Sequence, residues 1–297
     1  MTKKTFLIIG CYLAIYLIWG TTYFFIAKSV ETIPPSWVVA FRFLVGGLII
    51  LLIPILSGRI KSLPSRDEVK TSLFLGFFLL IMGNGVVTVA EKTVDSYIAS
   101  LIISTVPLVV AIMNKFFYKT TLNYKQILGF FIGFTGVALL LYSDTPRTAG
   151  EFKSILLLFL AITCWGFGTT WSKKMKHHPD TFFATGMQML FAGTIALIVT
   201  FFLKGDFNEI VTRISTISFI SILFLTFVGG SAIGAYNYLL RHEPTNRITS
   251  YALVNPLIAT IIGLFIGGES PTKYLWFGVV LILTGLTFML YLGRSRN

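Results

Sequence analysis

The chain has 297 residues, of which 55% are hydrophobic and only 12% are charged, and its formal net charge is +12. Soluble domains carry roughly 25% charged residues, so this composition excludes a soluble protein and indicates an integral membrane protein. The positive charge does not indicate nucleic-acid binding, because the Lys and Arg residues are scattered over short connections. Membrane topology and contact with anionic lipid headgroups account for it.

Ten apolar runs are long enough to cross a bilayer, which needs about 20 apolar residues per helix. They are continuous and rich in Phe, whereas strands of a membrane barrel alternate apolar and polar residues. The first run lacks the cleavage site of a signal peptide and stays in the chain as span 1. The sequence therefore predicts an all-α integral membrane protein with ten transmembrane helices, at residues 6–27, 36–57, 71–90, 96–117, 125–142, 152–172, 180–203, 216–240, 246–267 and 273–292.

The connections predict the orientation, because Lys and Arg near span ends are retained in the cytoplasm. With the N terminus inside, sixteen Lys and Arg residues are cytoplasmic and seven are on the opposite side. The seven are Lys28, Lys92, Arg147, Lys153, Lys204, Arg213 and Lys273. Both termini are therefore predicted to be cytoplasmic, in a protein of the cell inner membrane.

The two halves of the chain repeat one pattern. Trp19-Gly20-Thr21-Thr22 lies in span 1, and Trp165-Gly166 followed by Thr169-Thr170 lies 146 residues later in span 6. Five spans per half would make the second copy enter the membrane from the opposite side. We therefore expect two inverted five-helix repeats, residues 1–145 and 146–297. The 146-residue offset also relates Gly47 to Gly193, and an offset of 149 relates Gly85 to Gly234, Pro107 to Pro256, Gly129 to Gly278 and Gly136 to Gly285.

The sequence lacks the reacting groups of an enzyme: it contains no P-loop, no Gly-x-Ser-x-Gly and no His-Glu-x-x-His. Cys11 and Cys164 lie within predicted spans, and the three histidines have no metal-ligand spacing. We expect no enzymatic activity, no cofactor and no metal site.

Trp19 and Trp165 lie past the middle of their spans, whereas tryptophans that anchor a helix lie at the headgroup level. A packed aromatic at a helix contact is the alternative, and the recurrence in both halves favours a cavity. Gly20 and Gly166 follow directly, and together with the Thr hydroxyls they permit close backbone approach or local unwinding. These glycines are therefore predicted to act as hinge or gating positions.

Pro107 and Pro256 fall near the centres of spans 4 and 9, where proline removes a helical hydrogen bond and kinks the helix. They are predicted to shape the gates. Polar side chains surround them and also occur in spans 3 and 8, and such groups are costly when they face lipid. The predicted cavity lining is Trp19, Asn84, Tyr97, Trp165, Asn237, Tyr251 and Asn255, which offers aromatic faces for apolar or cationic groups and amides for polar ones.

Arg42 is the one full charge well inside a predicted span, and its repeat partner is Gln188. It could hold a substrate carboxylate or snorkel to the outer interface. No Asp or Glu lies deep in a span, since Glu91, Asp95 and Glu269 are all at outer ends. We therefore expect facilitated diffusion or exchange rather than stoichiometric proton symport.

The ten spans, the Trp-Gly motifs of spans 1 and 6, the prolines of spans 4 and 9 and the Gly-rich spans 5 and 10 together resemble the EamA-type drug/metabolite transporter superfamily. The resemblance implies a central cavity formed mainly by spans 1, 3, 4, 6, 8 and 9, with spans 5 and 10 as scaffold. It implies export of amino acids and other metabolites, while relatives move sugars, nucleotide sugars or quaternary amines. Many members carry an acidic residue after both span 4 and span 9, but here Glu269 has Thr120 as its counterpart.

These observations predict an alternating-access exporter, by uniport or exchange, of a small, partly apolar metabolite such as an amino acid. A lipid flippase or scramblase, an importer of a quaternary amine or sugar, and a channel stay open as alternatives. The expected partners are a small-molecule substrate and membrane lipids, and the oligomeric state stays open between monomer and homodimer.

Overall fold

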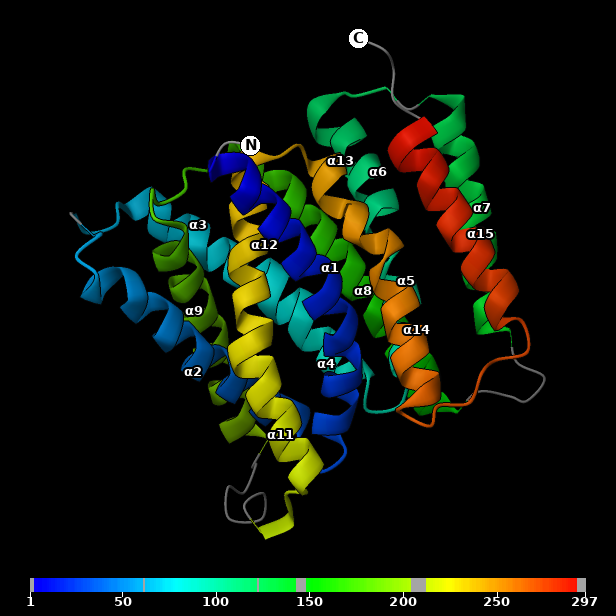
Figure 1. Cartoon of the computed structure of the whole chain (residues 1–297), viewed down its shortest axis with the longest axis horizontal. Helices are drawn as coiled ribbons and strands as arrows, with labels where there is room; N and C mark the ends of the chain where they lie inside the picture. The colour runs from blue at the N-terminus through cyan, green and yellow to red at the C-terminus, as the bar shows by residue number, and fades with distance from the viewer. Residues whose placement is uncertain (1–2, 61, 122, 143–147, 204–211, 293–297) are drawn as a thin grey trace.

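The computed structural model describes residues 3–60, 62–121, 123–142, 148–203 and 212–292, and in these ranges the chain forms helices and no strands (Figure 1). Eight segments of the described chain are long and apolar enough to cross a membrane. The protein is therefore an all-helical, multi-pass membrane protein. The eight spans are Lys4–Val30, Pro35–Leu56, Arg66–Ala90, Ser96–Tyr118, Tyr124–Leu141, Ala149–Lys174, Thr181–Phe202 and Thr216–His242.

The remaining two predicted spans, 246–267 and 273–292, contain the shorter apolar helices Thr249–Phe265 and Leu275–Leu290. The count of ten membrane-length helices is therefore not met by the described residues. The first of these segments is interrupted before Pro256, between a 3₁₀ turn (Thr249–Leu253), which follows α13 (Thr245–Ile248), and α14 (Asn255–Phe265). The second contains α15 (Leu275–Thr287).

Five of the first eight spans are single, unbroken α-helices, namely α1 (Lys3–Val30), α2 (Pro35–Leu56), α7 (Tyr124–Leu141), α8 (Ala149–Trp171) and α9 (Thr181–Phe202). The third span joins α3 (Arg66–Leu75) to α4 (Val86–Ala90), and the eighth joins α11 (Thr216–Phe224) to α12 (Gly230–His242). In both, the joining turns are π-helical, over Gly76–Gly85 and Leu225–Gly229. Such wide turns occur often at functional sites. The sequence pattern of these two spans did not predict this change of helical pitch.

The fourth span is divided into α5 (Ser96–Ile103) and α6 (Val106–Tyr118), with Pro107 in the first turn of α6. Pro256 lies in the first turn of α14 in the same way. At each break a tighter turn replaces the regular helix: the Leu108 amide donates to the Thr105 carbonyl at 2.9 Å, and the Leu257 amide donates to the Val254 carbonyl at 3.1 Å. The predicted kinks are thus interruptions at which a new helix starts, a position that proline tolerates well.

Helices α2 and α9 pack along one another through glycines that leave room for backbone. A Cβ added to Gly47 would lie 2.9 Å from the backbone nitrogen of Leu190, and one added to Gly193 would lie 2.6 Å from that of Leu44. The 146-residue offset relates Gly47 to Gly193 and Leu44 to Leu190, so each contact is the counterpart of the other. The glycines at equivalent positions of the two halves therefore make reciprocal contacts.

The pair α7 and α15 repeats this arrangement at one side of the bundle (Figure 1). A Cβ on Gly129 would lie 2.6 Å from the Gly285 carbonyl oxygen, and one on Gly136 would lie 2.9 Å from that of Gly278. These two contacts are exchanged by the 149-residue offset. No side chain fits between backbones this close, so glycine is required at the crossing.

Helix α1 begins, and α15 leads to the chain end, at the same end of the bundle (Figure 1). We call this the inner end and the opposite one the outer end, following the predicted orientation. Of the cations counted for that orientation, Lys61, Arg147, Lys204, Arg294 and Arg296 lie outside the described residues.

Candidate functional site

A small cavity lies between α1, the third and fourth spans, α8 and the turn before α14. Its volume is about 50 Å³, well below the roughly 300–1,000 Å³ of typical ligand pockets. Four of the predicted lining residues, Trp19, Asn84, Trp165 and Tyr251, meet there. The other residues that line it are Thr22, Tyr23, Ile26, Gly83, Val87, Ile103, Val106 and Ala161.

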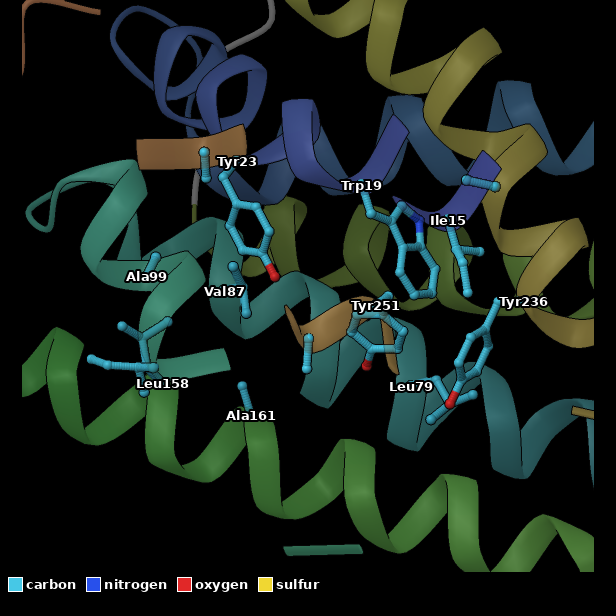
Figure 2. Packing of buried hydrophobic residues seen from close by; sticks show 14 of the residues in the cluster. Ile15, Trp19, Tyr23, Leu79, Val87, Ala99, Leu158, Ala161, Tyr236 and Tyr251 are labelled. Carbon is cyan, nitrogen blue, oxygen red and sulfur yellow. The ribbon is translucent and has the colours of Figure 1, made fainter. Parts of the chain in front are cut away.

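Three aromatic rings that line this space, from α1, α8 and the turn before α14, pack with a fourth ring, Tyr236 of α12. The Trp19 ring lies edge-on to Trp165 with centroids 5.5 Å apart, and it lies 5.1 Å from Tyr236 and 5.3 Å from Tyr251. Separations of 4.5–7 Å in tilted geometry are those that aromatic pairs prefer. Figure 2 shows the Trp19, Tyr236 and Tyr251 rings gathered beneath α1, with Ala161 of α8 across from them.

Tyr236 fixes the orientation of Trp165. Its hydroxyl accepts a hydrogen bond from Trp165 Nε1 at 3.2 Å and shares another with Thr169 Oγ1 at 2.6 Å. The residue predicted from sequence to line the cavity was its neighbour Asn237. Adjacent residues of a helix point in different directions, and nothing in the sequence distinguished which of the two faces the tryptophans.

The Trp-Gly motifs produce close helix crossings rather than unwinding, since α1 and α8 run through them unbroken. A Cβ on Gly20 would lie 2.8 Å from Ile258 of α14, and one on Gly166 would lie 2.8 Å from Val109 of α6. The 149-residue offset relates Val109 to Ile258. The two predicted hinge glycines therefore press the tryptophan-bearing helices against the helices that start at the two prolines.

Arg42 does not snorkel, because its side chain is only 1% exposed. Its Nη1 donates to Asn84 Oδ1 at 2.7 Å. Nε and Nη2 have no hydrogen-bond partner within the described part of the chain. The guanidinium lies beside Gly229, where an added Cβ would be 3.3 Å from Nη2. Arg42 thus lies behind the cavity wall and reaches the cavity through Asn84.

Three predicted lining residues lie outside this space because other groups satisfy them. The Tyr97 hydroxyl donates to the Ser270 carbonyl at 3.0 Å, at the outer end. Asn237 Nδ2 donates to Thr185 Oγ1 at 3.0 Å and to Gln188 Oε1 at 2.9 Å, which ties α12 to α9. Asn255 is 2% exposed and its amide nitrogen faces the Tyr16 carbonyl of α1 at 2.9 Å. These side chains hold helices together in this conformation.

Contacts between the two halves close the cavity at both ends. At the inner end the Tyr16 hydroxyl lies 2.6 Å from Ser250 Oγ, and the Tyr118 hydroxyl donates to the Thr170 carbonyl at 2.9 Å. At the outer end the Tyr97 contact is joined by Ser218 Oγ, which donates to the Lys28 carbonyl at 2.7 Å. In this conformation the cavity, at about 50 Å³, is smaller than a typical ligand pocket.

No group of three His, Cys, Asp or Glu side chains within the described ranges is placed to hold a metal ion. Cys11 and Cys164 are free thiols.

Comparison with known proteins identifies the family. The EamA-like transporter family matches the chain twice, over residues 6–142 and 152–291. An uncharacterized inner membrane transporter of Escherichia coli K12, YedA, is 34% identical over 286 residues, covering 93% of this chain and 90% of the relative. The uncharacterized transporter YdfC of Bacillus subtilis is 27% identical, covering 97% and 92%.

The fold is also shared with a solved crystal structure, which superposes with a TM-score of 0.68 at 15% identity and covers 96% of each chain. The family match spans nearly the whole chain, and the similar proteins carry transporter names. The protein is a membrane transporter, not an enzyme. It belongs to the EamA-like transporter family.

Proposed function

We propose that the chain is an alternating-access carrier of the inner membrane, with both termini in the cytoplasm, that exports a small, partly apolar metabolite such as an amino acid by uniport or exchange. The observation that carries this proposal is the meeting of Trp19 and Trp165 over an occluded cavity. These residues occupy equivalent positions of the two halves, and their centroids are 5.5 Å apart. A site at the junction of two inverted repeats is the arrangement on which alternating access depends.

The reciprocal contacts support two inverted five-helix repeats. The Gly47 and Gly193 contacts, and the crossings at Gly20 and Gly166, are exchanged when the halves are exchanged. The family match in two separate stretches agrees with this division. In such a design, rocking one half against the other opens one end while it closes the other.

The cavity wall favours a substrate with an apolar part and a carboxylate. The rings of Trp19, Trp165 and Tyr251 offer apolar faces. The Asn84 amide and the guanidinium behind it offer a polar end. A buried Arg with unsatisfied donors attracts an anionic group. A quaternary amine would gain cation–π contacts from the rings but would be repelled by Arg42, so a zwitterion with its carboxylate toward Arg42 fits better.

A thermal-shift screen of the purified protein tests this proposal, because a ligand that binds only the folded state raises its stability. The screen contains amino acids, nucleosides, sugars and quaternary amines. Hits then go to Trp165→Ala and to the matched control Trp276→Ala, whose indole is 59% exposed on the outside of the bundle.

We expect an amino acid to stabilise the wild type and the control but not Trp165→Ala. Transport follows as saturable counterflow in proteoliposomes. Hits that are indifferent to Trp165→Ala would refute the site, and scrambling of fluorescent lipids without counterflow would favour the flippase alternative.

A further inference from the structure

Glu91 is a buried carboxyl group that the proposed carrier mechanism does not use. It lies in the connection after α4, at the outer end as the sequence predicts, yet it is only 4% exposed. Neither carboxyl oxygen has a hydrogen-bond partner in the described part of the chain. The backbone of Ala27 favours the charged form of the carboxyl group. Its position in the sequence places this residue at the outer end of a span, and the packing buries it there.

Glu269 provides the contrast. Its Oε1 accepts from the Ser96 amide at 3.0 Å and its Oε2 accepts from the Tyr97 amide at 3.3 Å, at the start of α5. Backbone donors at a helix N terminus stabilise the charged carboxylate. Two acids of the same end therefore have opposite environments, one with donors and one without.

A pocket of about 500 Å³ at the outer end connects these acids to solvent, and Glu91 and Glu269 both line it. Lys28 also lines the pocket but is engaged by Glu31 at 2.7 Å. The outer pocket therefore reaches residue Glu91, whose carboxyl oxygens lie buried beside it. The charged and titratable groups that face Glu91 are Tyr23, Lys28 and Glu31 of α1 and its end, Arg42 of α2, Lys92 and Asp95 of its own connection, and Glu269.

The electrostatics follow from this placement. Burial raises the pKa of Glu91, the charge of Glu269 raises it further, and Arg42 lowers it. A carboxyl group without donors is more stable protonated when it is removed from water. Tyr23 lines the central cavity, and Arg42 is linked to it through its hydrogen bond to Asn84.

We propose that Glu91 is a proton-binding site reached from the outer side, and that its occupancy is coupled through Arg42 to the central cavity. When Glu91 is charged, it competes for the guanidinium. When it gains a proton, Arg42 is released to attract an anionic group of the substrate. Coupling of this kind is reciprocal, so an anion near Arg42 also strengthens proton binding. The proton site stands on its own geometry, while its coupling to substrate rests on the proposed function.

Infrared titration of the full-length protein in lipid nanodiscs tests the proton site without a substrate. The readout is the C=O stretching band of a protonated carboxylic acid as pH is varied. The variants are Glu91→Gln, Glu269→Gln and Arg42→Gln, each checked by size-exclusion chromatography. Glu68→Gln is the matched control, because Glu68 lies at the inner end and its carboxylate already accepts a hydrogen bond from the Ser65 amide at 2.9 Å.

We expect a band in the wild type that is lost in Glu91→Gln and unchanged in Glu68→Gln. Its midpoint moves down in Glu269→Gln, because a neighbouring negative charge is removed, and up in Arg42→Gln. These opposite shifts test the proposal even if Glu91→Gln does not fold. The proposal would be overturned by a band that survives in Glu91→Gln or by the absence of a band in the wild type. It would also be overturned if neither Glu269→Gln nor Arg42→Gln moved the midpoint of the titration. If the band behaves as expected but ligand stabilisation does not depend on pH, the coupling fails while the proton site stands.

Discussion

Replacing single glycines of α1 and α8 by alanine tests the helix crossings beside the tryptophans. At Gly20 an added Cβ would lie 2.8 Å from Ile258 Cβ and at Gly166 it would lie 2.8 Å from Val109 Cγ1, both far inside contact distance. Gly10 of the same helix α1 has nothing within 4 Å of its Cβ position. Overpacking of this kind costs about 1–3 kcal/mol.

The comparison with Gly10→Ala isolates that cost, because every Gly→Ala change in a helix shares the same gain in helix propensity, about 1 kcal/mol. We therefore expect Gly20→Ala and Gly166→Ala to be less stable than Gly10→Ala by about 1–3 kcal/mol. The assay is reversible unfolding of the purified protein in mixed detergent micelles. Equal stability of all three variants would refute the close crossings, and an effect at only one site would refute their equivalence in the two halves.

Three further changes test other parts of the structure. Asn84→Ala removes the hydrogen bond to Arg42 and should cost about 1.5–3 kcal/mol of unfolding free energy, the range for a hydrogen bond to a charged group. Asn84→Asp should retain this hydrogen bond. Equal losses of stability in the two variants would contradict a hydrogen bond between Asn84 and Arg42. Glu269→Ala removes the hydrogen-bond acceptor at the start of α5, and we expect a loss of about 1 kcal/mol of unfolding free energy. A cysteine introduced at the outer end should then react faster with a thiol reagent. Unchanged labelling would contradict a role of Glu269 in closing the outer end. Burial lowers the pKa of His177, so its contribution to the unfolding free energy should be full above the unfolded pKa near 6.5 and be lost as pH falls through the folded pKa. The slope of unfolding free energy against pH should flatten in His177→Gln. A slope that this change leaves unaffected would assign the pH dependence to another group.

Much of the fold follows from sequence because hydrophobic length and glycine spacing act locally. The apolar runs predict the membrane helices, and the glycine pairs Gly129–Gly278 and Gly136–Gly285, which the repeat offset relates, lie at the tight crossing of α7 with α15. The π-helical turns at Gly76–Gly85 were not foreseen, since a change of pitch depends on packing against α8 and α9. The helix interruption before Pro256 lies inside a segment that hydropathy treats as one span.

The part of the candidate site that could be predicted from sequence is the part that recurs in both halves. Trp19 and Trp165 stand out because they recur, and the structure brings them into contact. Tyr97 and Asn255 carry the same polar signal but are engaged by backbone carbonyls, and hydropathy cannot separate a polar group that lines a cavity from one that ties helices together. Glu91 shows the converse, because its position after a span suggested exposure and only tertiary packing buries it.

Accessibility of the cavity from each side of the membrane tests alternating access most directly. Ala161 lines the cavity and is 1% exposed, so Ala161→Cys is placed in a chain that also carries Cys11→Ala and Cys164→Ala. A membrane-impermeant thiol reagent is applied from the outside in right-side-out vesicles and from the inside in inverted ones. Alternating access predicts labelling from either side and protection by the ligand found in the thermal-shift screen. Labelling from one side only would contradict a cavity that opens to both sides in turn.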